Sequence, residues 1–331
     1  MAFHLRVLTH NVRYATSSPS PNERPWNERL PLIMSQLSYH TRYLDGREDT
    51  TATTPRPASI ICLQEVIHRQ LYDILSALNQ TCDAKDSPMI VPDGPTWASI
   101  GVAREDGVTK GEYSPILYPT RILKLLHFEN TWLSPTPDRP SKGWDAGCVR
   151  ILTTGVFEHK ANLKRVAVFN THLDNAGPKS REKSIGIILD VIHRICQHWA
   201  VESAAGNGQQ LNYVLAGDFN SLPAQDAYKA LLASGKVVDA YHSIPAAERY
   251  GSEITFTGFR LDAEDRSHRG RIDFIFYGPT SPSRQPSKND APDTLTSWKV
   301  SGYAALPNVF DNGVFCSDHR AVVTDAVLPG E

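Results

Sequence analysis

Gly217-Asp218-Phe219-Asn220 and Ser317-Asp318-His319 are the two segments that decide how this chain folds. An apolar run rich in Val, Leu and Ala precedes the first segment, and another follows the second, so residues 212–216 and 321–328 are predicted to be β-strands. Polar groups at the ends of neighbouring strands meet at one edge of a sheet. The two segments therefore predict one polar site built from distant parts of the chain.

The same pattern of apolar runs predicts four more strands, over residues 3–12, 59–63, 165–173 and 271–277. Apolar residues at helical spacing predict two amphipathic helices. We interpret the apolar face of each helix as packing on the core. The first face is formed by Leu71, Ile74, Leu75 and Leu78. The second is formed by Ile185, Ile188, Leu189, Ile192, Cys196 and Trp199. Short strands that alternate with helices indicate a layered α/β fold.

Three polar stretches, residues 41–57, 202–210 and 279–297, are rich in Pro, Ser, Thr, Gly, Asn or Asp and predict surface loops. Candidate site residues lie on both sides of each stretch. We therefore expect one catalytic domain that spans residues 1–331.

Composition excludes several classes of protein. The chain is 40% hydrophobic and 21% charged, which is typical of a globular protein rather than a disordered or fibrous one. Its formal net charge of -2 does not attract a polyanion such as DNA to the molecule as a whole. A local basic groove is still compatible with this net charge. Five widely spaced cysteines without a CxxC pair indicate neither a disulfide framework nor a zinc site.

The N-terminal residues lack the apolar core of a signal peptide, and no stretch is long and apolar enough to span a bilayer. We therefore expect a cytoplasmic protein that has no membrane association. Nothing in the sequence indicates an obligate protein partner.

Oxygen-bearing side chains follow several of the predicted strands. The set is Asn11, Glu65, Asp218, Asn220 and Asp318. Carboxylate and amide oxygens suit a hard ion such as Mg²⁺, with Mn²⁺ as a substitute, better than they suit zinc. The sequence therefore predicts a magnesium site whose remaining ligand positions are filled by water and substrate phosphate.

Two histidines accompany these oxygen ligands. His172 and His319 have the chemistry to donate hydrogen bonds to phosphate oxygens or to transfer protons. Asp273, in an apolar strand, is the expected carboxylate partner of His319, and Glu112 is the expected partner of His172. Each residue alone has a structural alternative: Asp273 as a partner of Arg271, His172 as a core histidine. The joint pattern favours a functional site.

Six ordered segments between residues 5 and 327 resemble the endonuclease/exonuclease/phosphatase superfamily, which has the deoxyribonuclease I-like fold. The segments are Thr9-His10-Asn11-Val12-Arg13, Leu63-Gln64-Glu65, Asn170-Thr171-His172-Leu173, Gly217-Asp218-Phe219-Asn220, Arg271-Ile272-Asp273-Phe274-Ile275 and Ser317-Asp318-His319. Three further segments resemble a subgroup of small microbial magnesium-dependent members: Gly111-Glu112-Tyr113-Ser114-Pro115-Ile116-Leu117-Tyr118, Trp132-Leu133-Ser134 and Lys142-Gly143-Trp144-Asp145.

The resemblance implies an α/β four-layer sandwich, in which two packed, mostly antiparallel β-sheets are flanked by α-helices. It implies that Glu65 is the main metal ligand, assisted by Asn11 and Asp318. By the same similarity, Asp218 orients or deprotonates the attacking water. Asn220 holds the phosphate or a metal-bound water, and His172 and His319 stabilise the transition state, with His319 oriented by Asp273.

The resemblance also implies the reaction class, a magnesium-dependent hydrolysis of phosphate esters by water. The leading interpretation is a phosphodiesterase or nuclease that acts on DNA, RNA or a nucleotide-like ester. The alternative is a phosphomonoesterase that acts on a sugar phosphate or another small phosphate, and a remote one is a catalytically silent binding module. The candidate substrate-binding residues are Glu112, Trp144 and Phe256. For Trp144 and Phe256, the structural alternative is loop or core packing.

Overall fold

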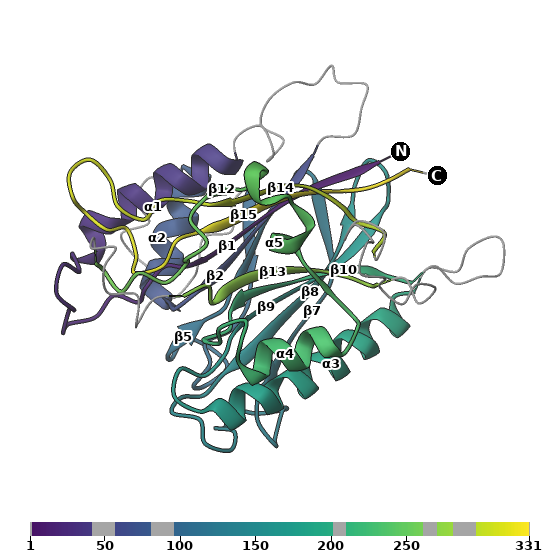
Figure 1. The fold of residues 1–331 in the computed structure, drawn as a ribbon, viewed down its shortest axis with the longest axis horizontal. Coiled ribbons are helices and arrows are strands. Elements are labelled where there is room, and N and C mark those ends of the chain that lie inside the picture. Colours follow the sequence, from purple (N-terminus) through teal and green to yellow (C-terminus); the bar gives the residue numbers. More distant parts are fainter. Residues whose placement is uncertain are drawn as a thin grey trace.

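Two β-sheets packed face to face form the centre of the molecule in the computed structural model (Figure 1). The structure describes residues 2–41, 57–80, 96–200, 210–260, 270–280 and 296–330. In spatial order, the seven-stranded sheet contains β12 (Tyr250–Gly251), β14 (Lys299–Ala305), β15 (Val322–Leu328), β1 (Phe3–Asn11), β2 (Ala58–Gln64), β6 (Ile116–Pro119) and β4 (Trp97–Ile100).

The six-stranded sheet contains β11 (Val238–Asp239), β13 (Asp273–Gly278), β10 (Asn212–Asp218), β9 (Arg165–His172), β8 (Ile151–His159) and β7 (Leu123–Trp132). A short pair, β3 (Val66–Ile67) and β5 (Glu112–Tyr113), lies beside the end of β2. The pairs β1/β2, β9/β10 and β12/β14 are parallel, and the other pairs of the described strands are antiparallel.

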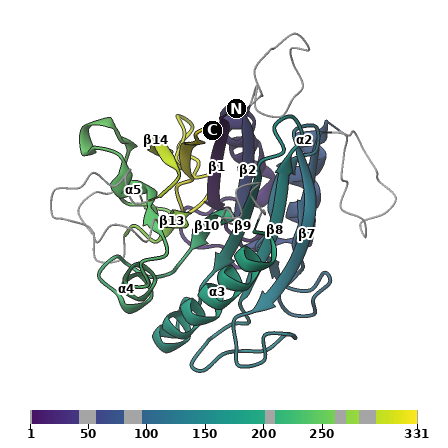
Figure 2. The same ribbon diagram turned by 90° about the vertical axis from the view of Figure 1, so that its right-hand side faces the viewer.

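Helices cover the outer face of each sheet. The helices α1 (Trp26–Thr41) and α2 (His68–Asn79) pack on the seven-stranded sheet, and α3 (Pro178–His198) and α4 (Asp226–Ala233) pack on the six-stranded sheet (Figures 1 and 2). Two short helices, α5 (Ala240–Ser243) and η1 (Ala246–Glu248), follow β11. This arrangement confirms the predicted four-layer sandwich.

The layers follow from the alternation of side chains along each strand. On β10, Val214 and Ala216 point into the core between the sheets, whereas Tyr213 and Leu215 point toward α3 and α4. Because successive side chains of a strand point to opposite faces, a strand that is apolar at every position fits between two apolar layers. The continuous apolar runs of the sequence are therefore strands buried on both faces.

The six predicted strands are all present, with ends within two residues of the predicted ones. The strands β7 and β8 were not predicted, nor was the helix α1. The loops predicted at 41–57, 202–210 and 279–297 lie almost entirely outside the described residues. Among the helices that the structure describes, none combines the length and the apolar character needed to cross a membrane.

Candidate active site

Strand register brings the polar strand ends together. In the seven-stranded sheet, Asn11 at the end of β1 lies beside Gln64 at the end of β2, and Glu65 follows. In the six-stranded sheet, Asp218 at the end of β10 pairs with His172 on one side and with Asp273 on the other. Since the two sheets pack face to face, both rows of polar groups meet at one end of the sandwich. The predicted gathering of these residues is confirmed.

The backbone at this end is held in uncommon conformations. Gly217 has a φ of 144°, and a Cβ atom there would lie 2.0 Å from the carbonyl oxygen of Thr171, so only glycine fits between β10 and β9. Glu65 and Asn220 have φ values of 56° and 44°. Such conformations cost about 1 kcal/mol or more each in non-glycine residues and concentrate at functional sites.

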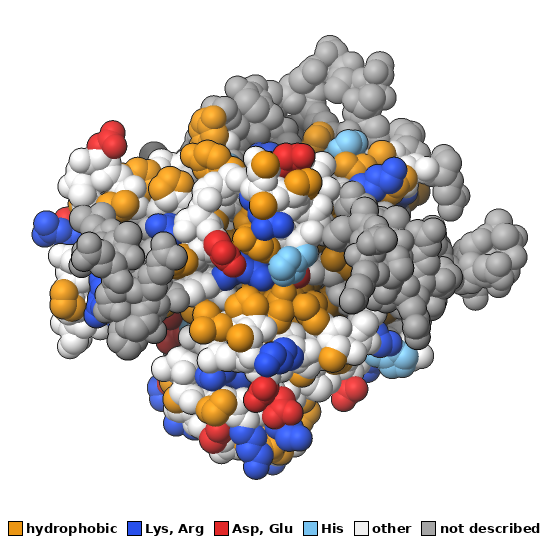
Figure 3. Space-filling view, viewed as in Figure 1, with side chains coloured by type: hydrophobic (Ala, Val, Ile, Leu, Met, Phe, Trp, Pro, Cys, Tyr) orange, Lys and Arg blue, Asp and Glu red, His pale blue; other side chains and the backbone are white. Residues whose placement is uncertain are grey.

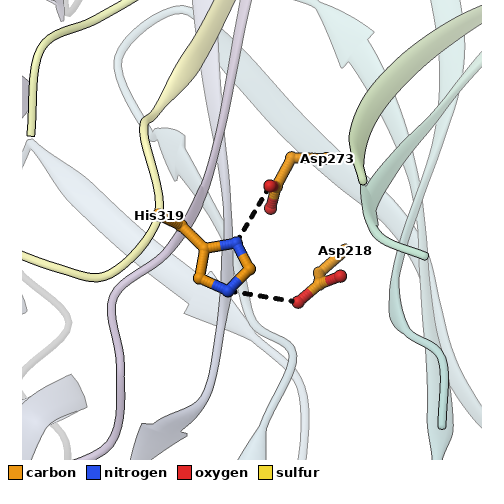
Figure 4. Close-up of side chains that lie close together, drawn as sticks. All are labelled: Asp218, Asp273 and His319. Atoms are coloured by element: carbon orange, nitrogen blue, oxygen red, sulfur yellow. Dashed lines mark hydrogen bonds and ion pairs between the residues drawn. The ribbon is translucent and has the colours of Figure 1, made fainter. Parts of the chain in front are cut away.

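His319 forms a dyad with Asp273, as predicted from the sequence. Its Nδ1 atom lies 2.9 Å from Oδ2 of Asp273, and its Nε2 atom faces Oδ2 of Asp218 at 3.7 Å (Figure 4). Burial lowers the pKa of His319, but the charges of Asp273 and Asp218 outweigh it and hold the pKa well above its ordinary value. His319 is therefore an imidazolium whose Nε2–H group faces the site.

Asp273 is not a partner of Arg271, the structural alternative that the sequence left open. Arg271 instead pairs with Asp239, with 2.7 Å between Nη1 and Oδ2. The fully buried Asp273 thus serves His319.

Asp218 lies at the centre of the polar groups. Its Oδ2 atom accepts a hydrogen bond from Nδ2 of Asn11 at 2.9 Å, and its Oδ1 atom accepts the backbone N–H of Asn220 at 2.8 Å. Burial raises the pKa of Asp218 to about 7, and the nearby charge of Asp273 adds to this, against the opposing effect of His319. A carboxylate with a pKa near neutrality is suited to act as a general base.

His172 is held as a neutral imidazole with a defined tautomer. Nδ2 of Asn220 donates to the carbonyl oxygen of Leu173 at 3.0 Å and lies 2.9 Å from Nε2 of His172. Because an amide nitrogen only donates, Nε2 accepts and the proton resides on Nδ1. Burial first, and then the charges of Arg150 and Arg104, hold the pKa of His172 well below its ordinary value.

The expected hydrogen bond between His172 and Glu112 is not formed, which corrects the prediction for Glu112. Nδ1 of His172 lies 3.9 Å from Oε2 of Glu112, too far for a hydrogen bond. Oε2 instead accepts Nη1 of Arg104 at 2.7 Å. Glu112 still lies beside the site, with Oε2 3.9 Å from Nδ1 of His172, and burial first, then the charge of Glu65, raise its pKa.

The carboxylates of the site are suited to a divalent cation. Burial raises the pKa of Asp318 to about 6, and the charge of Glu65 adds to it while His319 opposes it. Glu65, Asp218 and Asp318 thus crowd negative charge into a mostly buried space, and the guanidinium of Arg13 lies 3.7 Å from Glu65. A hard cation with oxygen ligands would offset this charge.

Two details bear on the metal ligands. Oδ1 of Asn11 accepts the backbone N–H of Arg13 at 3.0 Å, so the amide nitrogen of Asn11 faces the carboxylates of Glu65 and Asp218. Direct ligation by Asn11 stays a prediction.

Ligand atoms of Asp218, Asp273 and His319 also lie within 4.8 Å of one another. The hydrogen bond within the dyad occupies Nδ1 of His319 and Oδ2 of Asp273, however, so we favour the oxygen ligands.

Two aromatic residues predicted to line the substrate pocket have different surroundings. The ring of Phe256 lies 4.9 Å from the ring of His319, which places Phe256 in the wall of the site. Trp144 has a φ of 44° and is 40% exposed, on a turn before β8. Their roles in binding stay predictions.

Supporting residues had no predicted role. Arg29, which is 1% exposed, donates to the carbonyl oxygens of Val12, Arg13 and Cys316 and so joins the end of β1 to the segment that carries His319. Nε2 of Gln64 donates to Asn170 at 2.7 Å between the sheets. Gln64 and Asn170 stand in the motif segments, whereas nothing around Arg29 in the sequence marks it.

Comparisons with known proteins agree with this geometry. The model of the Endonuclease/Exonuclease/phosphatase family matches residues 8–319. An endonuclease/exonuclease/phosphatase family protein from Bacteroides thetaiotaomicron is 27% identical, with a TM-score of 0.73 over 99% of this chain and 96% of that one. The mannosyl-6-phosphatase Bt3783 of Bacteroides thetaiotaomicron VPI-5482 is 28% identical, with a TM-score of 0.70 over 97% and 99% of the two chains.

An uncharacterized protein of Acanthamoeba polyphaga mimivirus, L388, is 28% identical over 147 residues, which are 43% of this chain and 50% of the viral protein. The match therefore spans half the length of that relative. With the family match over residues 8–319 and the site at the strand ends, the chain belongs to the Endonuclease/Exonuclease/phosphatase family.

Proposed function

We propose that this protein is a divalent-metal-dependent hydrolase of phosphate monoesters, with Mg²⁺ as the cofactor and Mn²⁺ as a substitute. The observation that carries the proposal is the position of Asp218. Its carboxylate lies between the imidazolium of His319, at 3.7 Å, and the amide of Asn11, at 2.9 Å, inside a cluster of buried carboxylates. That arrangement provides a base, a cationic donor and a place for a cation within a few ångströms.

The reaction we infer is direct attack of water on the phosphorus. Asp218 takes a proton from the water as the new P–O bond forms, the P–O bond to the alcohol breaks, and the leaving alkoxide takes a proton from solvent. His319, held by Asp273, donates Nε2–H to a phosphate oxygen. Asn220 fixes Asp218 and His172 through its backbone and side-chain N–H groups.

Glu65 and Asp318, with Asn11 beside them, would hold Mg²⁺, which supplies positive charge to the phosphate oxygens when bound. Burial raises the pKa of Asp318 to about 6, and the charge of Glu65 adds to this, so a bound cation would offset the negative charge of these two carboxylates. Catalysis is then positioning and charge neutralisation, without a protein nucleophile.

Two observations favour a small monoester over nucleic acid, the other substrate class that the sequence left open. On the face drawn in Figure 3, Lys and Arg side chains are interspersed with Asp and Glu side chains, and the formal net charge of the chain is -2. Nucleic-acid binding normally needs a basic surface. The second observation is the similarity to the mannosyl-6-phosphatase named above, which is 28% identical over nearly the whole chain. Its name describes a phosphatase of a sugar phosphate, which supports a monoester as the substrate here.

A substrate panel tests the proposal. With Mg²⁺, we expect purified protein to release inorganic phosphate from monoesters such as hexose phosphates, and to leave supercoiled plasmid DNA and single-stranded RNA intact. Asp218→Asn serves as the blank for contaminating activity. Nicking of DNA by the wild type but not by the blank, without phosphate release from monoesters, would instead support the nuclease alternative.

A further inference from the structure

Two charged pairs lie beside His172 that the proposed reaction does not use. Arg104 pairs with Glu112, with 2.7 Å between Nη1 and Oε2, and their side chains are 11% and 15% exposed. Arg150 pairs with Asp174, with 3.3 Å between Nε and Oδ2, and is 5% exposed. Oε2 of Glu112, which accepts Nη1 of Arg104, lies 3.9 Å from Nδ1 of His172. Arg150 directly precedes β8, whose Leu152 pairs with Thr171, the neighbour of His172.

The group contains hydrogen-bond donors that the protein leaves unused. Among the described residues, Nε of Arg104, Nη1 of Arg150 and Nδ1 of His172 are buried and have no hydrogen-bond partner. Buried donors in folded proteins are nearly always paired, so three unpaired donors around one place indicate a missing acceptor. The three atoms are sealed from solvent in the free protein, so a substrate oxygen reaches them only when the partly exposed side chains of Arg104 and Glu112 move to admit it.

Charge indicates which chemical group fits. Two guanidinium groups face two carboxylates, so the formal charges of the four side chains cancel. A second phosphate would gain no net attraction there and would meet the carboxylates of Glu112 and Asp174. A hydroxyl group donates and accepts, so it can satisfy a guanidinium N–H and a carboxylate oxygen at the same time.

The turn that carries Trp144 is fixed to the same group. Asp174, which pairs with Arg150, also accepts the backbone N–H groups of Gly147 and Cys148 at 3.0 Å each. Asp145, next to Trp144, accepts the N–H of Ser180 in the first turn of α3 at 2.7 Å. The turn that carries the 40% exposed indole of Trp144 is thus joined to Arg150 through Asp174. An aromatic face of this kind packs well on the C–H face of a sugar ring.

We propose that Arg104, Glu112 and Arg150, with Trp144 at the rim, form a subsite for the hydroxyl groups of a sugar that carries the scissile phosphate. This inference rests on the proposed monoesterase function and deepens it, because it assigns the substrate class as sugar monophosphates. It also states that the subsite disfavours sugars with a second phosphate.

The test compares kcat/KM for a hexose 6-phosphate, for hexyl phosphate, which lacks hydroxyl groups, and for a hexose bisphosphate. For the wild type we expect kcat/KM to be at least tenfold higher for the hexose 6-phosphate than for either of the other two substrates. This is roughly the effect of one hydrogen bond to a charged group. Arg104→Lys keeps a positive charge beside Glu112 but removes the Nε donor. Arg104→Lys and Trp144→Leu should each lower the ratio of hexose 6-phosphate to hexyl phosphate about fivefold or more.

Tyr39→Leu is the matched control, because it also removes an exposed aromatic ring and should leave the ratio unchanged. Tyr39 lines a cavity with His4 and Arg6 at the opposite end of the nine-residue strand β1 from Asn11, roughly 25 Å away at about 3.3 Å per residue.

Three results would each overturn the inference while leaving the proposed function standing. They are equal kcat/KM for hexose 6-phosphate and hexyl phosphate, a higher kcat/KM for the bisphosphate, and unchanged ratios in both variants. If no monoester releases phosphate, the proposed function itself fails and the inference with it.

Discussion

Asp218→Asn is expected to lower kcat for phosphate release by about 10²–10⁴-fold, the usual contribution of a positioned general base. The substitution keeps the shape of the side chain and removes its basic oxygen. Burial already raises the pKa of Asp218 to about 7, so the ionised form is costly in the metal-free protein. Asn offers one acceptor where Asp218 accepts two N–H groups, so the donor left without a partner opposes this gain, and we expect the Tm of the metal-free variant to stay close to that of the wild type.

Asp325→Asn is the control for this variant. Asp325 pairs with Arg6 at 2.7 Å in the middle of β15, five residues along β1 from Asn11, and its replacement should leave kcat unchanged. The measurement is initial-rate kinetics with saturating Mg²⁺, together with thermal unfolding. A kcat for Asp218→Asn within a few-fold of the wild type would remove Asp218 as the base.

Loss of His319 should have a comparable effect. His319→Ala removes the charged donor that faces the phosphate, and we expect kcat to fall by about 10²–10³-fold, the cost of losing one transition-state donor. Asp273→Asn should act differently, because it leaves the imidazole in place. The charge of Asp273 helps to hold the pKa of His319 well above its ordinary value, so its removal lowers that pKa.

The direction of the pH effect follows from the role of His319. The imidazolium is the active form, so activity is present below its pKa and is lost as pH rises through it. In Asp273→Asn, the alkaline loss of kcat should therefore occur at lower pH than in the wild type. Asp239→Asn, which removes another buried carboxylate from its pair with Arg271, should lower stability without this shift. An unchanged alkaline limb in Asp273→Asn would contradict the dyad.

The fold was predictable where burial alone decides the structure. Residues 213–216 and 166–169 are continuously apolar before the polar ends of their strands, because β10 and β9 are buried on both faces. The strand β7 mixes Lys124, Glu129 and Asn130 with apolar residues at the edge of its sheet, so its sequence lacks that signal. The helix α1 contains Pro31, which normally argues against a helix interior.

The site was predictable where residue type alone fixes the chemistry. Asp218 ends β10 and Asp273 begins β13, so strand register pairs them, and His319, shortly before β15, bonds to Asp273. The partners of charged side chains were less predictable, because they depend on loops that approach from elsewhere in the chain. Glu112 pairs with Arg104 rather than with His172 for this reason.

The central claim is that these buried carboxylates hold a catalytic cation, and metal titration of activity tests it most directly. After removal of metal with EDTA, we expect phosphate release from a monoester to stop and to return when Mg²⁺ is added. Glu65→Ala should shift the midpoint of that titration to higher Mg²⁺ concentration, because it removes a ligand. Full activity after thorough chelation, or an unchanged midpoint in Glu65→Ala, would contradict the account.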